Sequence, residues 1–243
     1  MTRVVTTKPK VASAKAKPRA TAVVRRSQAE RSATTRAKVI EAAIACLHRL
    51  GYRMTTTTVV ADEAGVSRGA MAHHFASKNE LMLAVVRGVF ETDSEHTLKS
   101  LSALEPLEVV RALPSTLWDV VSRPSGIAVM EIMLASRSDP DMAARLRKVQ
   151  LQIDREARAW VIEQHAAAGI QERADGEAIH RLVVAAHRGL VLEAIFMRNR
   201  AEVEKSIAVL DDVMQYLYPK LAKTDKPARA VKATAKPPRS GAG

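Results

Sequence analysis

The residues best suited to chemistry in this chain of 243 residues are basic and small polar side chains around one glycine, Gly65. The segment 56–75, TTTVVADEAGVSRGAMAHHF, places Arg68 and the pair His73 and His74 among small residues. Its spacing predicts two short helices, and Gly65 can adopt the positive φ of a tight turn between them. In a helix-turn-helix the second helix lies in the major groove of DNA. The segment therefore predicts sequence-specific DNA binding.

The elements around this motif are predicted to be helices. Apolar residues recur at helical spacing before it and end at Gly51, where a helix can stop in a left-handed conformation. These residues are Val39, Ile40, Ala43, Ile44, Leu47 and Leu50. Ser77 and Glu80 form a capping box that opens a further helix after the motif. Later prolines stand where a first helical turn tolerates them, and the whole pattern predicts about nine helices and no strand.

The composition also favours an all-α fold. Hydrophobic residues make up 47% of the chain and aromatic residues only 3%, which favours helices over a β-sandwich. A single cysteine, Cys46, excludes an internal disulfide framework and is expected to be a buried, unreactive thiol. No apolar run approaches about 18 residues, so we expect no membrane span and a cytoplasmic protein. An organelle transit peptide is the weaker alternative, because Pro9 and Pro18 interrupt the basic N-terminus.

With these pieces in this order, the chain resembles the TetR family of bacterial transcriptional regulators. The resemblance covers roughly residues 35–90. The matching pieces are Ala42 and Ala43, Leu47, Gly51 and Tyr52, the threonines 55–58, the run ADEAGVS at 61–67, Gly69 to Met71, Phe75, and Ser77 to Leu81. It implies an N-terminal three-helix domain with a helix-turn-helix, followed by a helical domain that binds an effector and forms a homodimer.

The resemblance and the side-chain chemistry together predict which residues contact DNA. Arg68 and Ala70 take positions similar to the family's base-contacting ones, and arginine can bond a guanine edge while alanine touches a thymine methyl group. Hydroxyl and N–H groups at helix starts can hold phosphate, as the family's lysine does at the position of Lys78. Surface imidazoles without a DNA contact are the alternative for the two histidines. The predicted DNA-binding residues are Thr56, Thr57, Thr58, Ser67, Arg68, Gly69, Ala70, His73, His74 and Lys78.

One position departs from the family pattern. The family usually has a tyrosine that contacts the DNA backbone where this chain has Ala72. Alanine cannot make that contact. We expect His73, His74 or the basic N-terminal segment to compensate for it.

Charge divides the chain into segments with different predicted roles. The net charge is +12, of which residues 1–33 carry +8 and residues 223–243 carry +5, which leaves −1 for the middle. Both ends lack apolar periodicity, so we expect disordered tails that either solubilise the protein or attract phosphate non-specifically. We expect a DNA-binding domain at 34–90 and a ligand-binding and dimerisation domain at 91–222.

The C-terminal half offers a candidate pocket. The resemblance implies an effector whose binding changes the spacing of two DNA-reading helices. Adaptable methionines in apolar stripes suit a largely apolar ligand, with ordinary core packing as the alternative. Arg137, Arg188 and two histidines could anchor an acidic head group such as a carboxylate. The predicted ligand-binding residues are Leu117, Trp118, Met130, Met133, Arg137, His180 and His187.

Catalysis and metal binding find little support in the sequence. His180 and His187 are seven residues apart on one helix face, which makes a metal pair conceivable. Core or interface positions are the better interpretation, because no cysteine or carboxylate partner has the spacing of metal ligands. We therefore predict no metal, no cofactor and no enzymatic activity.

The last two predicted helices, at 176–199 and 201–218, carry apolar residues at helical spacing. Two such helices from each copy can close a four-helix bundle, and a two-fold dimer is what a palindromic operator in double-stranded DNA requires. The favoured function is a homodimeric transcriptional repressor that a small-molecule effector releases from its operator. The alternative is an architectural or constitutive DNA-binding protein that relies on its basic tails.

Overall fold

The computed structural model describes residues 28–171, 175–197 and 199–219, and its regular structure is helical throughout. These residues form nine α-helices and one short 3-10 helix, with no strand among them, which confirms the all-α prediction. The helices are α1 (Gln28–Met54), α2 (Thr57–Ala64), α3 (Arg68–His74), α4 (Lys78–Leu101), α5 (Pro106–Val121), α6 (Pro124–Ala135), η1 (Ser136–Ser138), α7 (Pro140–Ala167), α8 (Gly176–Met197) and α9 (Arg200–Leu217). The segment 223–243 and most of 1–33, where we predicted basic tails, lie outside the described residues.

The helix starts follow the predicted caps. Thr56, Ser67 and Ser77 each accept a hydrogen bond at Oγ from the backbone N–H three residues further on, at 3.1–3.2 Å. The capping box differs in one detail, because the Glu80 carboxylate accepts the N–H of Ala76, at 3.4 Å. Each cap satisfies backbone donors that have no partner inside the helix. The register of the helix-turn-helix is therefore set locally.

Three glycines with positive φ lie at or near helix ends. Gly51, Gly65 and Gly169 have φ angles of 72°, 64° and 68°, which are in the left-handed region that glycine adopts readily. The start of α1 corrects one expectation. It begins at Gln28, so residues 28–33 are helical where we expected a disordered tail. Good helix formers and the acidic Glu30 in the first turn favour this extension.

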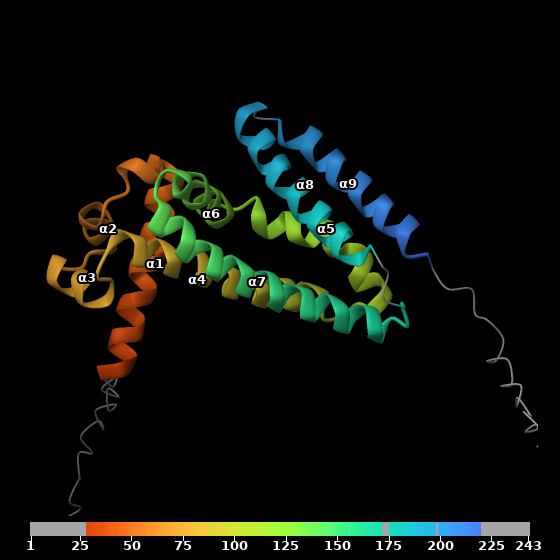
Figure 1. The fold of residues 1–243 in the computed structure, drawn as a ribbon, viewed down its shortest axis with the longest axis horizontal. Helices are drawn as coiled ribbons and strands as arrows, with labels where there is room; N and C mark the ends of the chain where they lie inside the picture. The colour runs from red at the N-terminus through yellow and green to blue at the C-terminus, as the bar shows by residue number, and fades with distance from the viewer. Residues whose placement is uncertain (1–27, 172–174, 198, 220–243) are drawn as a thin grey trace, which may run out of the picture.

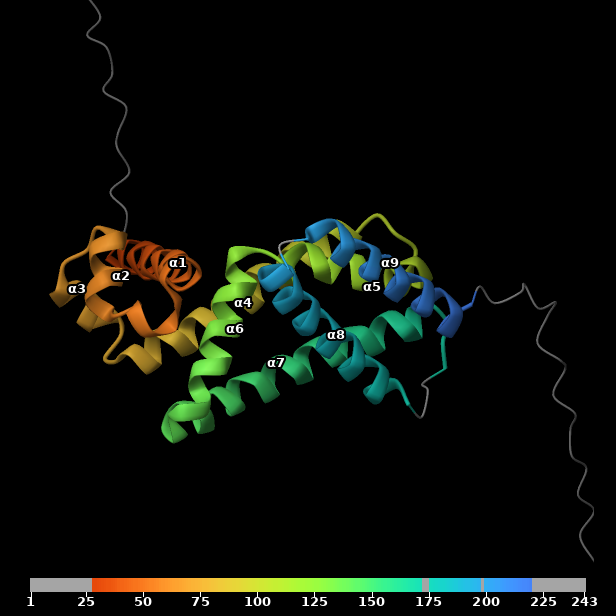
Figure 2. The same ribbon diagram turned by 90° about the horizontal axis from the view of Figure 1, so that it is seen from above.

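One hydrophobic core joins the DNA-reading helices to the rest of the molecule. Val60 of α2 and Met71 of α3 are buried with Leu47 of α1. The same cluster includes Val85 of α4 and Ile132 of α6. Figure 2 shows α6 lying between the α1–α3 unit and the longer helices, and α4 running out of that unit. Because α4 is continuous from 78 to 101, the proposed domain boundary at residue 90 falls within a helix.

The C-terminal half is a layered helical array. Figure 1 shows α8 and α9 side by side along one edge, over α5, with α4 and α7 on the opposite side. Val203, Ile207 and Met214 of α9 are buried within the chain, where the first two pack with Trp118 of α5. None of the described helices combines the length and the apolar character that a bilayer span requires.

We predict that Gly65→Ala lowers stability while Gly65→Asn does so less. A Cβ at Gly65 would meet no atom within 4 Å, so the effect isolates the cost of φ 64°. That conformation costs an alanine about 1–2 kcal/mol and is tolerated better by asparagine. The measurement is the thermal midpoint, with an expected loss of about 3–6 °C for alanine. Equal midpoints for the glycine and alanine proteins would contradict the strained turn.

Candidate functional site

The turn between α2 and α3 holds two short helices in a helix-turn-helix. The N–H of Gly65 bonds to the carbonyl oxygens of Ala61 and Asp62, and the N–H of Val66 also reaches Ala61 O, at 3.0 Å. These bonds close α2, and Ser67 caps α3 directly afterwards. The α2–α3 pair therefore forms an end of the molecule, with α3 at its outer edge (Figures 1 and 2).

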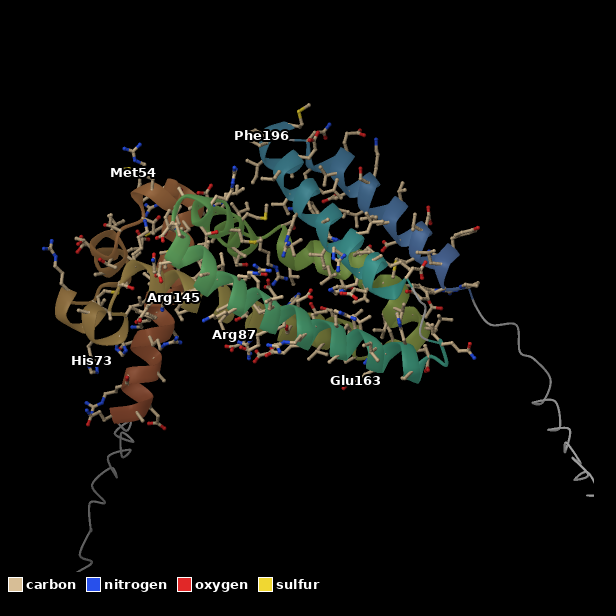
Figure 3. The ribbon with its side chains drawn as sticks, in the orientation of Figure 1. Met54, His73, Arg87, Arg145, Glu163 and Phe196 are labelled. Carbon is tan, nitrogen blue, oxygen red and sulfur yellow. The ribbon has the colours of Figure 1, made fainter. Side chains whose placement is uncertain are left out.

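Helix α3 turns one face inward and presents the other to solvent. Met71 and Phe75 are 3% and 4% exposed, which fixes the helix against the core. The exposed residues of α3 and its cap are Ser67, Arg68, Gly69, Ala72 and His73, and Ala70 and His74 are half-buried. His73 is labelled at this end in Figure 3. The Arg68 side chain bonds to none of the described residues, so its guanidinium group is free to donate to a base edge.

The helix-start hydroxyls keep a donor for phosphate. The Oγ atoms of Thr56 and Ser67 act as acceptors in the caps, so each O–H proton remains available. Thr57 and Thr58 are half-buried at the start of α2. These four residues lie on the α2–α3 unit, as the sequence predicted.

Lys78 is the predicted DNA ligand whose surroundings differ most from expectation. Its Nζ donates to the carbonyl oxygen of Tyr52 at 2.6 Å and lies 4.0 Å from the centre of the Tyr52 ring. Burial lowers the pKa of this ammonium group. We expected a clamp on DNA phosphate, whereas the structure shows a bond between the start of α4 and the last turn of α1. The contact between Lys78 and Tyr52 could not be predicted from local sequence patterns, because the two residues are 26 positions apart.

A second bond to Tyr52 comes from α6. The N–H of Tyr52 donates to Glu131 Oε2 at 2.9 Å, and the same carboxylate oxygen would lie 3.4 Å from a Cβ at Gly51. Sequence analysis missed Glu131, because no local pattern marks a pair 79 residues apart. It also missed Arg36 of α1, whose guanidinium carbon lies 5.3 Å from the ring centre of Phe75, just after α3. Arg36 is exposed, so it adds a cation to the α3 side of the unit.

Two adjoining cavities lie in the C-terminal half. The smaller, about 240 Å³, is lined from α4, α5, α6, α7 and α8, and the larger, about 430 Å³, is lined from α4, α5, α7, α8 and α9. Both walls include Phe90, Asp93, Leu117, Val121, Ala157 and His180. The shared wall places the two spaces next to each other along the length of the helical array.

The structure brings five of the seven predicted ligand-binding residues to these walls. Leu117, Met130, Met133, His180 and His187 line the smaller cavity. Trp118 and Arg137 do not belong to either of these two linings. Trp118 is 4% exposed and packs with Val191 and α9, because it follows Leu117 and so lies on another face of α5. Arg137 is exposed in the 3-10 turn between α6 and α7.

His187 lines the smaller cavity, but both of its ring nitrogens already lie within hydrogen-bond distance of backbone carbonyl oxygens. The ring nitrogens lie 2.7 Å from Val183 O and 2.8 Å from Pro114 O, and the residue is 3% exposed. It therefore joins α8 to α5 rather than offering a free donor to a ligand.

Four other charged or titratable residues line the smaller cavity, namely Asp93, Asp154, His180 and Arg188. Burial raises the pKa of the Asp93 carboxyl from 3.8 to about 6, and the positive charge of Arg123 opposes that rise. His180 Nε2 lies 3.5 Å from Asp154. Arg188 lines the wall, and sequence analysis had considered it only as a possible anchor. In the described ranges, no group of three or more His, Cys, Asp or Glu residues is placed to hold a metal ion.

The comparisons with known proteins agree with this arrangement. Residues 39–85 match the family model for bacterial regulatory proteins of the tetR family. The HTH-type transcriptional regulator CymR of Pseudomonas putida is 27% identical over 186 residues, which cover 74% of this chain and 89% of CymR. The multidrug binding protein EbrR, complexed with imidazole, has a TM-score of 0.54 at 24% identity, over 78% of this chain and 98% of EbrR. A SmeT–triclosan complex gives a TM-score of 0.58 at 22% identity, over 84% of this chain and all of that one (100%).

An exposed second helix on a helix-turn-helix, joined to an all-helical half, defines a DNA-binding transcriptional regulator of the helix-turn-helix class. Residues 39–85 match the DNA-binding domain of the TetR family of bacterial regulatory proteins, and over most of its length the chain is similar to a bacterial transcriptional regulator. Members of this family are regulators rather than enzymes.

We predict that Asp93→Asn stabilises the protein at pH 7.5 and that the gain disappears towards pH 4. The carboxyl pKa is raised in the folded state, so its contribution to stability is full below about pH 4 and is lost as the pH rises through about 6. Asparagine does not ionise, so it avoids that loss. After allowance for partial exposure, we expect about 1–2 kcal/mol, or a few degrees in the thermal midpoint.

The matched control is Asp119→Asn, an exposed aspartate on α5. It should leave the midpoint unchanged at both pH values. A gain for Asp93→Asn that is equal at pH 4.5 and pH 7.5 would show that its carboxyl ionises normally.

Proposed function

We propose that this protein is a homodimeric repressor, acting in the cytoplasm, that binds a palindromic operator and leaves it when a small molecule occupies the cavities. The observation that carries the proposal is the exposed face of α3, with the unpaired Arg68, on a structure whose other half contains a cavity. Repression follows if the occupied operator blocks access to a promoter. The small-molecule complexes of EbrR and SmeT support the ligand part of the proposal.

At the operator, α3 enters the major groove. Arg68 reads a base edge, and Gly69 and Ala70 allow the backbone to come close. Phosphate contacts come from the hydroxyls of Thr56, Thr57, Thr58 and Ser67, from His73 and His74, and from Arg36. In this proposal Lys78 acts chiefly by holding Tyr52, since its ammonium group is already bonded there.

Helix α6 is the proposed link between ligand and DNA. Gly126, Val129, Met130 and Met133 of α6 line the smaller cavity, while Glu131 of the same helix holds the N–H of Tyr52. A ligand that displaces α6 would therefore move the turn that carries α1 into α2. An effector releases DNA only if it binds the two conformations with different affinities, so this displacement has to differ between them.

The outward faces of α8 and α9 are the proposed dimer surface. Leu182, Phe196 and Tyr216 are 67%, 79% and 85% exposed, which is unusual for such large apolar side chains. Phe196 lies at the outer end of α8 (Figure 3). Ala186 and Gly189 line a shallow groove between the two helices, where small residues allow a second copy to approach closely. Two α8–α9 pairs would then form a four-helix bundle.

We predict that Arg68→Ala weakens binding to the operator by about 1–3 kcal/mol and leaves binding to random-sequence DNA nearly unchanged. The loss follows from the two hydrogen bonds that arginine makes with a guanine edge. The operator is first selected from random duplexes with the wild-type protein, and affinities are then measured by fluorescence anisotropy at fixed salt. Arg155→Ala, at an exposed arginine of α7, is the control and should change neither affinity.

The same assay separates this proposal from an architectural protein. If the basic tails carry the binding, removal of residues 1–27 and 220–243 abolishes it, and Arg68→Ala has no effect on any duplex. For a sequence-specific regulator, removal of the tails lowers both affinities together, because counterion release does not depend on sequence. The ratio of operator to random-sequence affinity then stays close to that of the full chain.

We predict that Leu182→Glu weakens the dimer by about 100-fold or more, because it buries an unpaired carboxylate in the interface. Sedimentation equilibrium measures the dimer dissociation constant. Leu151→Glu, at a 54% exposed leucine of α7, should have no effect. A dimer that survives Leu182→Glu unchanged would place the interface elsewhere.

A further inference from the structure

The smaller cavity contains an arginine without a counter-ion. Arg188 of α8 contributes to its wall. Within the described part of the chain, no carboxylate oxygen lies within 4.0 Å of a nitrogen of Arg188, and it makes no hydrogen bond. More than a third of its surface is accessible, yet the surrounding protein dehydrates it enough to lower the pKa of the guanidinium group. The negative charge of Asp154 partly opposes this lowering of the pKa, but its carboxylate lies beyond ion-pair distance from Arg188.

The neighbouring acids do not remove this imbalance. The carboxylate of Asp154 lies 3.5 Å from His180, and its side chain is 56% exposed, so water screens it. Asp93 differs in kind, because a carboxyl group can become neutral by taking up a proton, and its raised pKa of about 6 shows that burial favours this form. A guanidinium group has no such route, since it cannot lose its proton in a protein. An anion from outside is what would satisfy Arg188.

The larger cavity offers more space and more apolar wall than the smaller one. Its volume is about 430 Å³, and its wall is mostly apolar. Leu113, Trp160, Val161, Ile179 and Met214 contribute to it. Because Phe90, Leu117 and Ala157 belong to both walls, an extended molecule with its head beside Arg188 has a continuous apolar surface to follow away from α6.

We propose that the two cavities together take an amphipathic organic acid, whose carboxylate pairs with Arg188 and whose hydrocarbon body extends into the larger cavity. The inference rests on the proposed role of the cavities as the effector site and names the chemical class of that effector. It also replaces Arg137 by Arg188 as the anchor. The acidic head lies in the compartment that α6 lines, and so on the side of the link to Tyr52.

The test is calorimetric titration of the full chain, without DNA, at pH 5.5, where the Asp93 carboxyl is mostly neutral and an alkanoate is still mostly ionised. The probes are the straight-chain alkanoates with six to ten carbons, together with the 1-alkanol and the 1-alkylamine of each length. We expect each alkanoate to bind at least about 10-fold more tightly than its alcohol and its amine, because a charge-assisted pair is gained. Each added methylene should tighten binding about three- to four-fold until the body fills the cavity.

The variants locate the head group. Arg188→Gln should weaken alkanoate binding by about 10- to 100-fold and leave alkanol binding unchanged, while Arg188→Lys should restore part of the loss. Arg155→Gln is the matched control, at an exposed arginine on a helix that also lines the cavity, and should change nothing. Arg188 makes no bond in the described chain, so its replacement is expected to leave folding intact, which the thermal midpoint checks.

The inference is overturned if amines bind more tightly than acids, or if Arg188→Gln does not change alkanoate affinity. If Arg188→Gln does not fold, the relative affinities of the wild-type protein for the acid, the alcohol and the amine test the inference instead. Operator binding is measured in a separate assay. Alkanoate binding that leaves operator affinity unchanged would support the ligand class and refute effector control, so the two proposals fail independently.

Discussion

The backbone of Tyr52 is the constraint on which the arrangement of the two halves depends. The positive φ of Gly51 ends the main part of α1, and the next peptide units are held from both sides. Glu131 of α6 accepts the N–H of Tyr52, and Lys78 of α4 donates to its carbonyl oxygen and faces its ring. Bonds to charged groups contribute about 1.5–3 kcal/mol each, so this one residue couples three helices more firmly than apolar packing alone.

That junction also explains why α2 and α3 can be short. Helices of seven and eight residues are marginal by themselves, and these two are kept in place by their caps and by burial of Val60, Met71 and Phe75 against α1. The position of α1 relative to α4 and α6 in turn sets where α3 points. In the proposed mechanism, a displacement of α6 would move the DNA-reading face as a rigid unit, because close-packed cores absorb little movement.

Two charged groups at the wall of the smaller cavity are unfavourable for the stability of the protein. Arg188 has no counter-ion in the described chain, and burial disfavours the charged form of Asp93. Both features disfavour the ligand-free protein, and in the proposed effector site an acidic head group would give Arg188 its missing counter-ion. Binding sites commonly retain such unfavourable groups, because optimising them for stability would remove the recognition. The apolar walls around them strengthen any ion pair formed inside.

Recognition of DNA rests on few side chains. The middle of the chain is close to neutral in total charge, so in the proposed complex the DNA contacts depend on individual side chains of the α2–α3 unit. Arg68 and Arg36 supply the local cations, and Ala72 leaves the outer face of α3 without an aromatic ring. The basic segments at the two ends account for the net positive charge, and attraction of such segments to phosphate does not depend on DNA sequence.

The helices, their caps and the helix-turn-helix could be derived from the chain alone, because these features depend on residues within four positions of each other. Ser67, Gly65 and Ser77 have the roles that their types and spacing predict, and five of the seven predicted cavity residues reach the walls. Long-range pairings decided the rest. Lys78 bonds to Tyr52, and Trp118 packs in the core. Glu131 meets Tyr52, and Arg188 reaches the cavity wall, only because folding brings separate helices together. Neighbours along a helix are set by its period, whereas neighbours across helices depend on how several apolar faces pack at once.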